Sequence, residues 1–173
     1  MSGIENDRAL SDVANSALWP ASHPPTVAPV KQRHRPRWLA YLDHTADEGI
    51  EVRAPDLETL FERCAWGMFS ILTDMPDVKP ATRESVSVEA TDREALLLRW
   101  LSELNVRHQT RHVLFSRFEV RELTDVSLTA DAWGEPIDGA RHKVHAEIKA
   151  VTYHMLRIER GERGWTARVL FDV

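Results

Sequence analysis

The residues of this chain that could do chemistry together lie in two short acidic segments, one before the first predicted helix and one at the end. Segment 43–47 reads DHTAD, and segment 171–173 reads FDV. If the second segment ends a strand, the Asp172 carboxylate lies beside the terminal carboxylate of Val173. With Asp47 next to them, three oxygen-bearing anionic groups would converge and repel one another. A hard cation such as Ca²⁺ or Mg²⁺ stabilises such an arrangement.

The same aspartates also have purely structural interpretations. Asp47 can cap a turn through its own side chain, and Asp172 can be a solvated charge at a chain end. Their separation along the sequence does not decide between these hypotheses, because the segments meet only if the first and last strands pair side by side. A joint metal site therefore stays open at the level of the residues.

Other side chains with chemical potential have simpler explanations. His108 and His112 are four residues apart, as metal-binding histidine pairs on a helix are, but no glutamate lies between them in the manner of HExxH. We interpret this polar stretch as a solvated helix end. Cys64 lies on the apolar stripe of a predicted helix, which favours a buried small hydrophobic residue over a nucleophile.

No complete set of catalytic residues is recognisable in the motifs. The chain contains no GxSxG, P-loop, GxGxxG or CxxC pattern, the local signatures of nucleophile elbows, phosphate cradles, dinucleotide sites and redox pairs. Glycine contributes only 7 of 173 residues, which argues against a glycine-rich phosphate loop.

The overall composition is that of an ordinary globular protein. A length of 173 residues favours one domain, and 43% hydrophobic and 28% charged residues are typical values. A net charge of −5 argues against a basic nucleic-acid binder, so a link to RNA would run through a partner. The single cysteine excludes an internal disulfide framework and fits the reducing cytoplasm. We expect no membrane span and no signal peptide.

The leader at 1–36 differs from the rest of the chain. It contains five of the nine prolines and ends in a basic run, with no apolar periodicity. We predict a flexible proline-rich N-terminal extension, with a basic arm that touches RNA or a partner as the alternative. Residues 37–173 are predicted to form the folded domain.

Residues 37–173 show the periodicities of strands and of two long helices. A helix is predicted to begin with Asp56 as its N-cap and to end between residues 73 and 76, with apolar residues at steps of three and four. A second helix is predicted to follow the capping-box pattern at 91–94. Strands are predicted at 38–43, 49–53, 85–90, 114–123, 126–133, 144–158 and 165–173.

This order of elements predicts the fold class. Two strands, a helix, a strand and a second helix come before a run of strands. Such an order favours an α+β fold, here a two-layer sandwich in which two helices pack on one face of a mostly antiparallel mixed sheet.

Several segments, in order along the chain, resemble the archease family. They are DHTADEGI at 43–50, LETLF at 57–61, LFSRFEV at 114–120, AWGE at 132–135, KAVTYH at 149–154 and ARVLFDV at 167–173. The resemblance runs from about Trp38 to the last residue. Two departures are visible: Glu48 occupies a position where we expect an apolar residue, and 105–112 is more polar than the usual end of the second helix. The second departure could alter a partner surface.

This resemblance implies an accessory protein rather than an enzyme. Archeases promote the activity of the GTP-dependent RNA ligase of the RtcB type. They speed guanylylation of the ligase and let it turn over repeatedly in tRNA splicing or RNA repair. The implied partners are that ligase and, only indirectly through it, RNA. The implied location is the cytoplasm, with no membrane partner.

The resemblance also implies a bound divalent cation, with calcium as the first expectation and magnesium or manganese as alternatives. Carried over residue by residue, its ligands are Asp47, Asp172 and Val173. Lesser candidates for contact with a partner or with the site are Asp43, His44, Lys149 and His154. For Lys149, a solvated charge on a strand is the competing interpretation.

Two other functions remain open. A chaperone-like modulator of another RNA-modifying enzyme, such as a tRNA methyltransferase, would alter that enzyme's specificity or aggregation and leave ligation unaffected. A metal-dependent hydrolase could use the same acids, but the motifs contain no general base to activate water.

Overall fold

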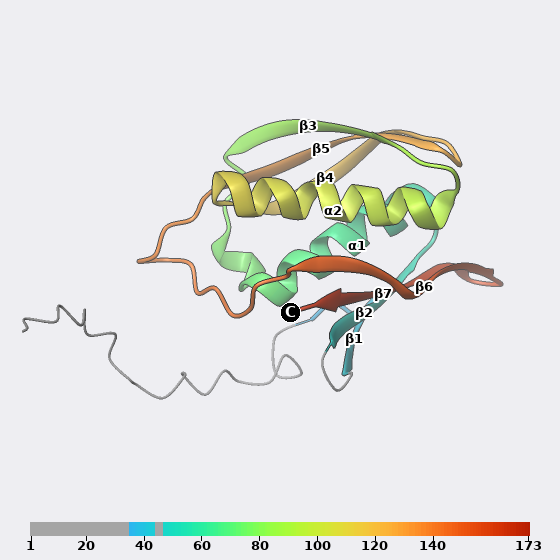
Figure 1. Ribbon diagram of the computed structural model, residues 1–173, viewed down its shortest axis with the longest axis horizontal. Helices are drawn as coiled ribbons and strands as arrows, with labels where there is room; N and C mark the ends of the chain where they lie inside the picture. The colour runs from blue at the N-terminus through green and yellow to red at the C-terminus, as the bar shows by residue number, and fades with distance from the viewer. Residues whose placement is uncertain (1–34, 44–46) are drawn as a thin grey trace, which may run out of the picture.

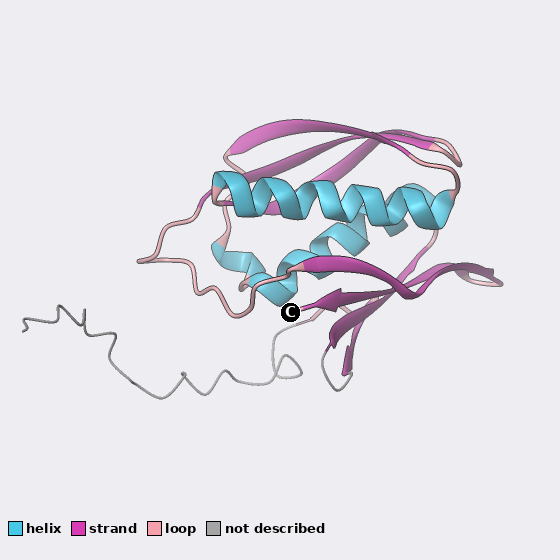
Figure 2. Ribbon diagram, in the orientation of Figure 1, coloured by secondary structure: helices cyan, strands magenta, loops and turns pink. Residues whose placement is uncertain are grey.

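The computed structural model describes residues 35–43 and 47–173 (Figure 1). Most of the predicted extension at 1–36 therefore lies outside the described residues. Two helices lie between two antiparallel sheets (Figures 1 and 2). The elements are, in chain order, β1 (Leu39–Asp43), β2 (Asp47–Ala54), α1 (Leu57–Leu72), the 3-10 turn η2 (Met75–Asp77), β3 (Thr82–Glu89), α2 (Arg93–Arg111), β4 (Val113–Leu123), β5 (Ser127–Pro136), β6 (Ala150–Gly161) and β7 (Gly164–Asp172).

The strands of the described residues divide into two sheets. One sheet has the order β1-β2-β7-β6 and the other β3-β5-β4, and neighbouring strands in both are antiparallel. The α+β class and the predicted order of elements are confirmed. The sequence led us to expect one partly mixed sheet with both helices on a single face. Instead, α1 packs against β2 and β4, which belong to different sheets.

The burial of α1 explains the second sheet. All residues from Gly67 to Leu72 are buried, so this end of the helix is covered on every side rather than along one stripe. One sheet covers only one side of a helix, and a second layer must cover the other. The second helix is shared in the same way, since α2 packs against β6 of one sheet and against β3 and β4 of the other.

The first helix begins at its predicted N-cap. The second begins one residue later than the capping-box pattern at 91–94 implies, with Asp92 rather than Thr91 as its N-cap. The Asp56 side chain accepts a hydrogen bond from the backbone N–H of Thr59 at 2.8 Å, and the Asp92 side chain accepts one from the N–H of Ala95 at 2.8 Å. Each carboxylate satisfies a backbone donor that has no partner inside its helix. Local hydrogen bonds of two aspartates therefore decide where the helices begin.

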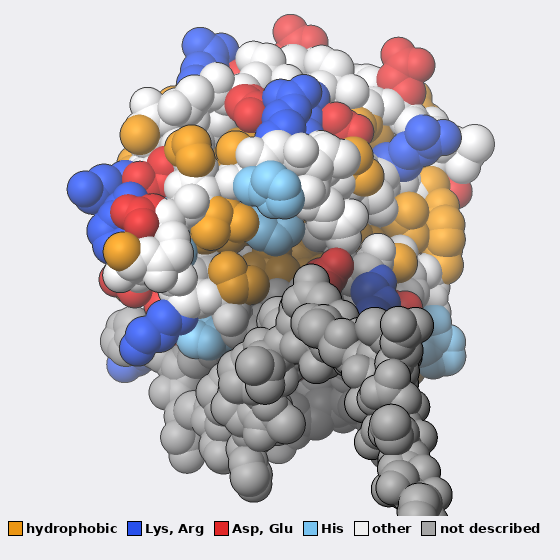
Figure 3. Space-filling view, turned by 60° about the vertical axis from the view of Figure 1, so that its left-hand side comes forward, with side chains coloured by type: hydrophobic (Ala, Val, Ile, Leu, Met, Phe, Trp, Pro, Cys, Tyr) orange, Lys and Arg blue, Asp and Glu red, His pale blue; other side chains and the backbone are white. Residues whose placement is uncertain are grey.

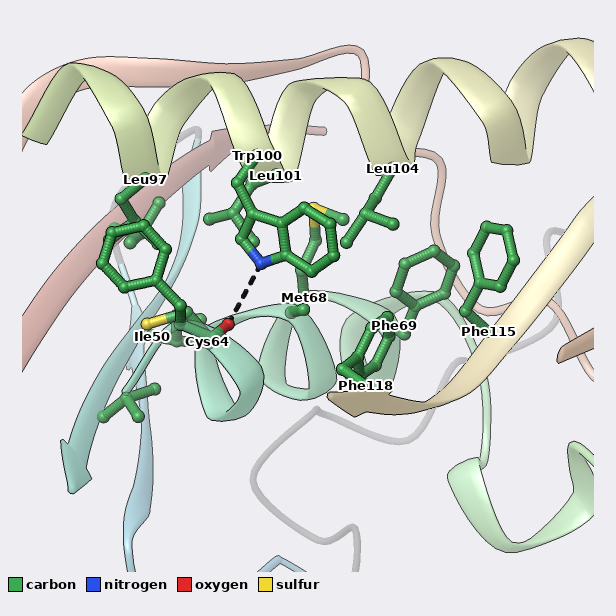
Figure 4. Close-up of a cluster of buried hydrophobic side chains, with 14 of the residues drawn as sticks. Ile50, Cys64, Met68, Phe69, Leu97, Trp100, Leu101, Leu104, Phe115 and Phe118 are labelled. Atoms are coloured by element: carbon green, nitrogen blue, oxygen red, sulfur yellow. Dashed lines mark hydrogen bonds between the residues drawn. The ribbon is translucent and has the colours of Figure 1, made fainter. Parts of the chain in front are cut away.

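The core fills the space between the helices and the sheets (Figure 4). The indole of Trp100 on α2 donates to the Phe61 carbonyl oxygen on α1 at 3.2 Å, which joins the two helices. Phe69 meets Phe115 edge to face, with ring centroids 5.6 Å apart. Cys64 is fully buried in this cluster, and burial raises the pKa of its thiol. The prediction that Cys64 is a structural residue is confirmed.

The connection between β5 and β6 differs from the sequence prediction. The strand predicted at 126–133 continues as β5 to Pro136, while the strand predicted from 144 begins only at Ala150. A Cβ at Gly134 would overlap the Leu114 carbonyl oxygen of β4. This glycine marks the close approach of two strands rather than a turn. Segment 137–149 forms a long loop, tied to the end of α1 by the bridge between Thr73 and Val144.

Neither α1 nor α2 is long and apolar enough to cross a membrane, and no other helix among the described residues is either.

Candidate functional site

The two acidic segments meet at one end of the first sheet. Strand β2 pairs with β7 in a register that places Asp47 directly opposite Asp172. Side chains of directly opposite residues in an antiparallel pair point to the same face, with Cβ atoms about 4.5–5.5 Å apart. The fold therefore brings together two carboxylates that are separated by nearly the whole folded domain along the sequence. We name this end of the sheet, comprising Asp47, Lys149, Asp172 and Val173, the acidic tip.

Strand β6 brings Lys149 to the same place. Ala150 pairs with Asp172, and the backbone N–H of Lys149 donates to the Asp172 carbonyl oxygen at 2.8 Å. The Lys149 ammonium donates to the main-chain oxygen of Val173 at 3.1 Å. Figure 1 shows the C-terminal end beside the start of β6. The lysine is thus held at the acidic tip by both its backbone and its side chain.

The two opposed carboxylates carry an electrostatic cost. Like charges directly opposite on paired strands repel one another. Within the described part of the chain, neither the Asp47 nor the Asp172 carboxylate has a hydrogen-bond or ion-pair partner. Their oxygens are therefore available to an external cation, and carboxylate and main-chain oxygens are the ligands that Ca²⁺ and Mg²⁺ prefer.

Side chains alone do not complete a metal site here. The described residues contain no group of three or more His, Cys, Asp or Glu side chains that could hold a metal ion. Among the described residues, the main-chain oxygen of Val173 follows Asp172 directly and is the third ligand that the family resemblance implies. The donor set nevertheless consists only of hard oxygens, which fits a hard divalent cation.

The lesser candidates are placed differently. Asp43 ends β1 and pairs with Glu48, so its backbone lies one residue pair from Asp47, but its side chain is outside the described part. His44 lies outside the described residues. His154 is exposed in the irregular part of β6 between Thr152 and Arg157. It lies four residues beyond Ala150, about 13 Å along the strand, and the structure does not bring it to the acidic tip.

His108 is not part of a solvated helix end, and that interpretation was wrong. The side chain is 8% exposed, and its ring packs edge to face against Phe69. Its Nδ1 forms a hydrogen bond with the Val113 carbonyl oxygen at 2.7 Å. Burial lowers its pKa, which favours the neutral ring. His112 ends α2 in the left-handed conformation. The missed signal was the inner stripe of α2, which continues from Leu101 and Leu104 to position 108.

A second buried polar group was not predicted from the sequence, because Glu135 at the end of β5 meets Arg141 and His142 of the following loop only in the folded chain. Glu135 is 9% exposed, and both of its carboxylate oxygens accept hydrogen bonds from Arg141 at 2.9 Å. His142 is 5% exposed and lies 3.2 Å from the same carboxylate. This cluster holds the start of the loop at 137–149, and further hydrogen bonds join it to the backbone of Asp77 and Lys79.

The outer surface carries charges of both signs. On the face shown in Figure 3, Lys and Arg side chains are interspersed with Asp and Glu side chains, with hydrophobic side chains between them. On β3, β5 and β4, Arg83 and Arg117 flank the Trp133 ring at 6.0 and 4.4 Å from its centroid. Asp131 and Glu119 form ion pairs with the arginines of that sheet. The described surface on this sheet is therefore largely charge-balanced.

Comparison with known proteins identifies relatives over the described domain. The model of the archease protein family matches residues 39–173. Protein archease of Methanopyrus kandleri is 38% identical over 135 residues, which cover 76% of this chain and 96% of the relative. Protein archease of Thermococcus gammatolerans is 40% identical over 141 residues, which cover 79% of this chain and 99% of the relative.

Solved structures show the same fold. The solution structure of a Methanobacterium thermoautotrophicum protein matches with a TM-score of 0.70 and 39% identity, over 79% of this chain and 99% of that chain. The crystal structure of a Thermotoga maritima protein, described as an archease and possible chaperone, matches with a TM-score of 0.52 and 20% identity. It covers 82% of this chain and 100% of that chain.

Proposed function

This chain belongs to the archease family, and on that premise we propose that it is a non-catalytic activator of a GTP-dependent RNA ligase of the RtcB type. It promotes guanylylation of the ligase and repeated turnover in tRNA splicing or RNA repair. The observation that carries this proposal is the register that sets Asp47 opposite Asp172, with Lys149 bound to Val173 beside them. The two carboxylates have no hydrogen-bond or ion-pair partner among the described residues. They are therefore available for contact with a partner protein.

The acidic tip would act through a divalent cation, with calcium as the first expectation and magnesium or manganese as alternatives. Asp47, Asp172 and the main-chain oxygen of Val173 would hold it. Such a cation would supply positive charge that stabilises the negative charge of a phosphoryl group during its transfer. The chain's own contribution is to hold these oxygens at the end of a rigid sheet, where strand pairing fixes their separation.

Lys149 has a separate role in this proposal. Its ammonium donates to the Val173 main-chain oxygen, so it orients one of the oxygens that would hold the cation. Its position at the acidic tip also offsets part of the repulsion between Asp47 and Asp172. Lys149 therefore positions the tip, while the two aspartates bear the negative charge.

Any contact with RNA would be indirect. The full chain has a net charge of −5, and basic side chains on the face of Figure 3 are interspersed with acidic ones. Binding of a nucleic-acid backbone requires concentrated positive charge. The ligase would supply that charge, and this protein would act on the ligase.

The test is multiple-turnover RNA ligation by the cognate ligase with GTP and metal. Wild-type protein is expected to stimulate turnover, and Asp47→Ala and Asp172→Ala are expected to lose most of the stimulation. Glu162→Ala serves as the control, because Glu162 is an exposed acid in the turn at the other end of β7. Full stimulation by both tip variants would rule out the acidic-tip mechanism.

A second function is favoured by one observation. The Thermotoga maritima structure of the same fold is described as that of a possible chaperone. A chaperone-like modulator of another RNA-modifying enzyme, such as a tRNA methyltransferase, would suppress aggregation of that enzyme or change its specificity. Stimulated methylation with unchanged ligation would favour this function over ligase activation.

A further inference from the structure

Two side chains near the C-terminal end of α2 form hydrogen bonds with the loop at 137–149, which leads into the acidic tip. Asn105 and Gln109 lie one helical turn apart on the same face. The side-chain amide of each donates to the Ile148 carbonyl oxygen, and both N···O distances are 2.8 Å. Two amides therefore occupy both acceptor positions of one carbonyl. We call Asn105 and Gln109 the amide clamp.

Asn105 occupies a position that packing alone would give to an apolar residue. It is 4% exposed and continues the row of Leu101 and Leu104, which are fully buried. Its Nδ2 is satisfied by Ile148, but its Oδ1 is buried and has no hydrogen-bond partner among the described residues. A leucine would leave no unpaired acceptor there. The structure thus uses only the donor of this side chain, and only for Ile148.

From Ile148 the contacts continue directly into the acidic tip. The Ile148 side chain is fully buried, which anchors the residue in the core. The next residue, Lys149, donates from its backbone to Asp172 and from its ammonium to Val173. A displacement of the Ile148 carbonyl would therefore move the Lys149 backbone and the partner strand that carries Asp172.

The loop has few other means of placing Ile148. Segment 137–149 forms no regular strand. Its middle is tied to the end of α1, where the Thr73 hydroxyl donates to the Lys143 carbonyl oxygen at 2.9 Å and the N–H of His145 donates to the Leu72 carbonyl oxygen at 2.8 Å. The amide clamp holds the last buried residue before the chain enters β6.

We propose that Asn105 and Gln109 are positioning residues that set the geometry of the acidic tip through the Ile148 carbonyl. The proposal rests on the proposed function for the role of the tip, but the positioning itself is a statement about this chain alone. Its consequence is that α2, although distant from Asp47 in sequence, controls how Lys149 and the main-chain oxygens of Asp172 and Val173 are presented to a cation and to the ligase.

The first readout is hydrogen exchange of the Lys149 amide, followed by NMR in the full-length chain without metal. In Asn105→Leu combined with Gln109→Leu, exchange is expected to be about 25-fold faster, because two hydrogen bonds of ordinary net strength are lost, at about fivefold each. Asn105→Leu alone is expected to give a smaller increase with an unchanged or higher melting temperature, because it also removes the unpaired Oδ1 and leaves Gln109 on the carbonyl. Thr110→Val is the matched control, since Thr110 is exposed on the same turn and bonds only within α2.

The second readout is ligase stimulation in a mutant cycle. Stimulation is expected to fall about tenfold in the double clamp variant, as small misplacements of positioning groups do. Adding Lys149→Ala to the double clamp variant should lower stimulation little further, because both changes act on the contact between Lys149 and Val173. A merely structural role would instead lower the melting temperature of Asn105→Leu and add fully to Lys149→Ala.

The outcomes separate this inference from the proposed function. If Lys149→Ala abolishes stimulation while the clamp variants leave both exchange and stimulation unchanged, the clamp inference is overturned and the proposed function stands. If the wild-type protein does not stimulate the ligase, the proposed function fails, and if the tip variants stimulate as well as wild type, its acidic-tip mechanism fails. In either case the exchange rate of the Lys149 amide decides the clamp: faster exchange supports it, and an unchanged rate overturns it.

Discussion

The opposed carboxylates of Asp47 and Asp172 have two consequences at the scale of single residues. Without a cation they repel one another across the β2–β7 pair. A cation bound between them, as we propose, would replace the repulsion by attraction to a shared charge and would bind the folded chain better than the unfolded one, in which the two residues are far apart. Metal binding and stability are therefore coupled at this position.

We predict that Ca²⁺ stabilises the wild-type protein by about 2.7 kcal/mol at a hundredfold excess over its dissociation constant. Asp172→Asn should lose this gain and, without metal, be up to about 1 kcal/mol more stable than wild type, because the repulsion is relieved. Thermal unfolding with and without Ca²⁺ measures both effects, with Glu162→Gln as the control. An equal Ca²⁺ response in Asp172→Asn would contradict the site.

Gly134 shows how one residue decides the approach of two strands. The absence of a Cβ lets the β4 backbone at Leu114 lie against β5. We predict that Gly134→Ala lowers the free energy of unfolding by about 1–3 kcal/mol, because a strand must shift to make room. Urea denaturation checks this. Gly139→Ala is the control, since nothing lies within 4 Å of a Cβ there, and it should change stability by less than about 0.5 kcal/mol.

At the scale of elements, the loop at 137–149 connects β5 to β6 and ends at the acidic tip. Its start is held by Glu135, which accepts hydrogen bonds from Arg141 and from the Lys79 N–H at 2.7 Å. Its end is held by the amide clamp on Ile148. The placement of Lys149 therefore depends on polar contacts at both ends of the loop as well as on its backbone hydrogen bond to Asp172 of β7.

This loop predicts a pH dependence. Arg141, followed by the Lys79 N–H, lowers the pKa of Glu135 from 4.5 to about 2. Because the folded pKa is depressed, the stabilising contribution is complete above pH 4.5 and is lost as the pH falls toward 2. Glu135→Gln should be less stable than wild type at pH 7, with a difference that shrinks between pH 4.5 and 2. Denaturation midpoints of wild type and Glu135→Gln between pH 4.5 and 2 test this prediction. A stability difference that stays constant over this range would contradict it.

At the scale of the whole molecule, the charge distribution limits which partners the protein can bind directly. The net charge of −5 and the mixture of signs on the face of Figure 3 provide little attraction for a polyanion. A partner that carries the positive charge can still use the acidic tip. This is consistent with an accessory protein that acts on an enzyme rather than on its RNA.

We accordingly predict no retention of tRNA by the protein alone in a filter-binding assay at physiological salt. Retention should appear when the ligase is added, because the ligase supplies the basic surface.

Deleting residues 1–36 should leave ligase stimulation unchanged if the leader is only an extension. RNA binding by the full chain that disappears with this deletion would favour the basic-arm alternative instead.

The sequence by itself determined the features that depend on neighbouring residues. Asp56 and Asp92 cap helices through bonds to residues three positions on, and the apolar stripes of both helices follow from a period of 3.6. The element order and the α+β class follow from these local signals. The choice of Asp47 and Asp172 as candidates came from their residue types and from the family resemblance, and the residues alone left their meeting open.

Only the tertiary structure decided which distant residues meet. Three features join segments that are far apart in the chain: the pairing of β2 with β7, the division into two sheets, and the hydrogen bond from Asn105 to Ile148. A slip of one residue in the strand register would turn every side chain of that strand to the other face of the sheet. The free energy that selects the correct register comes from burial of the whole core. For the same reason His108, which reads as polar in sequence, lies inside the protein.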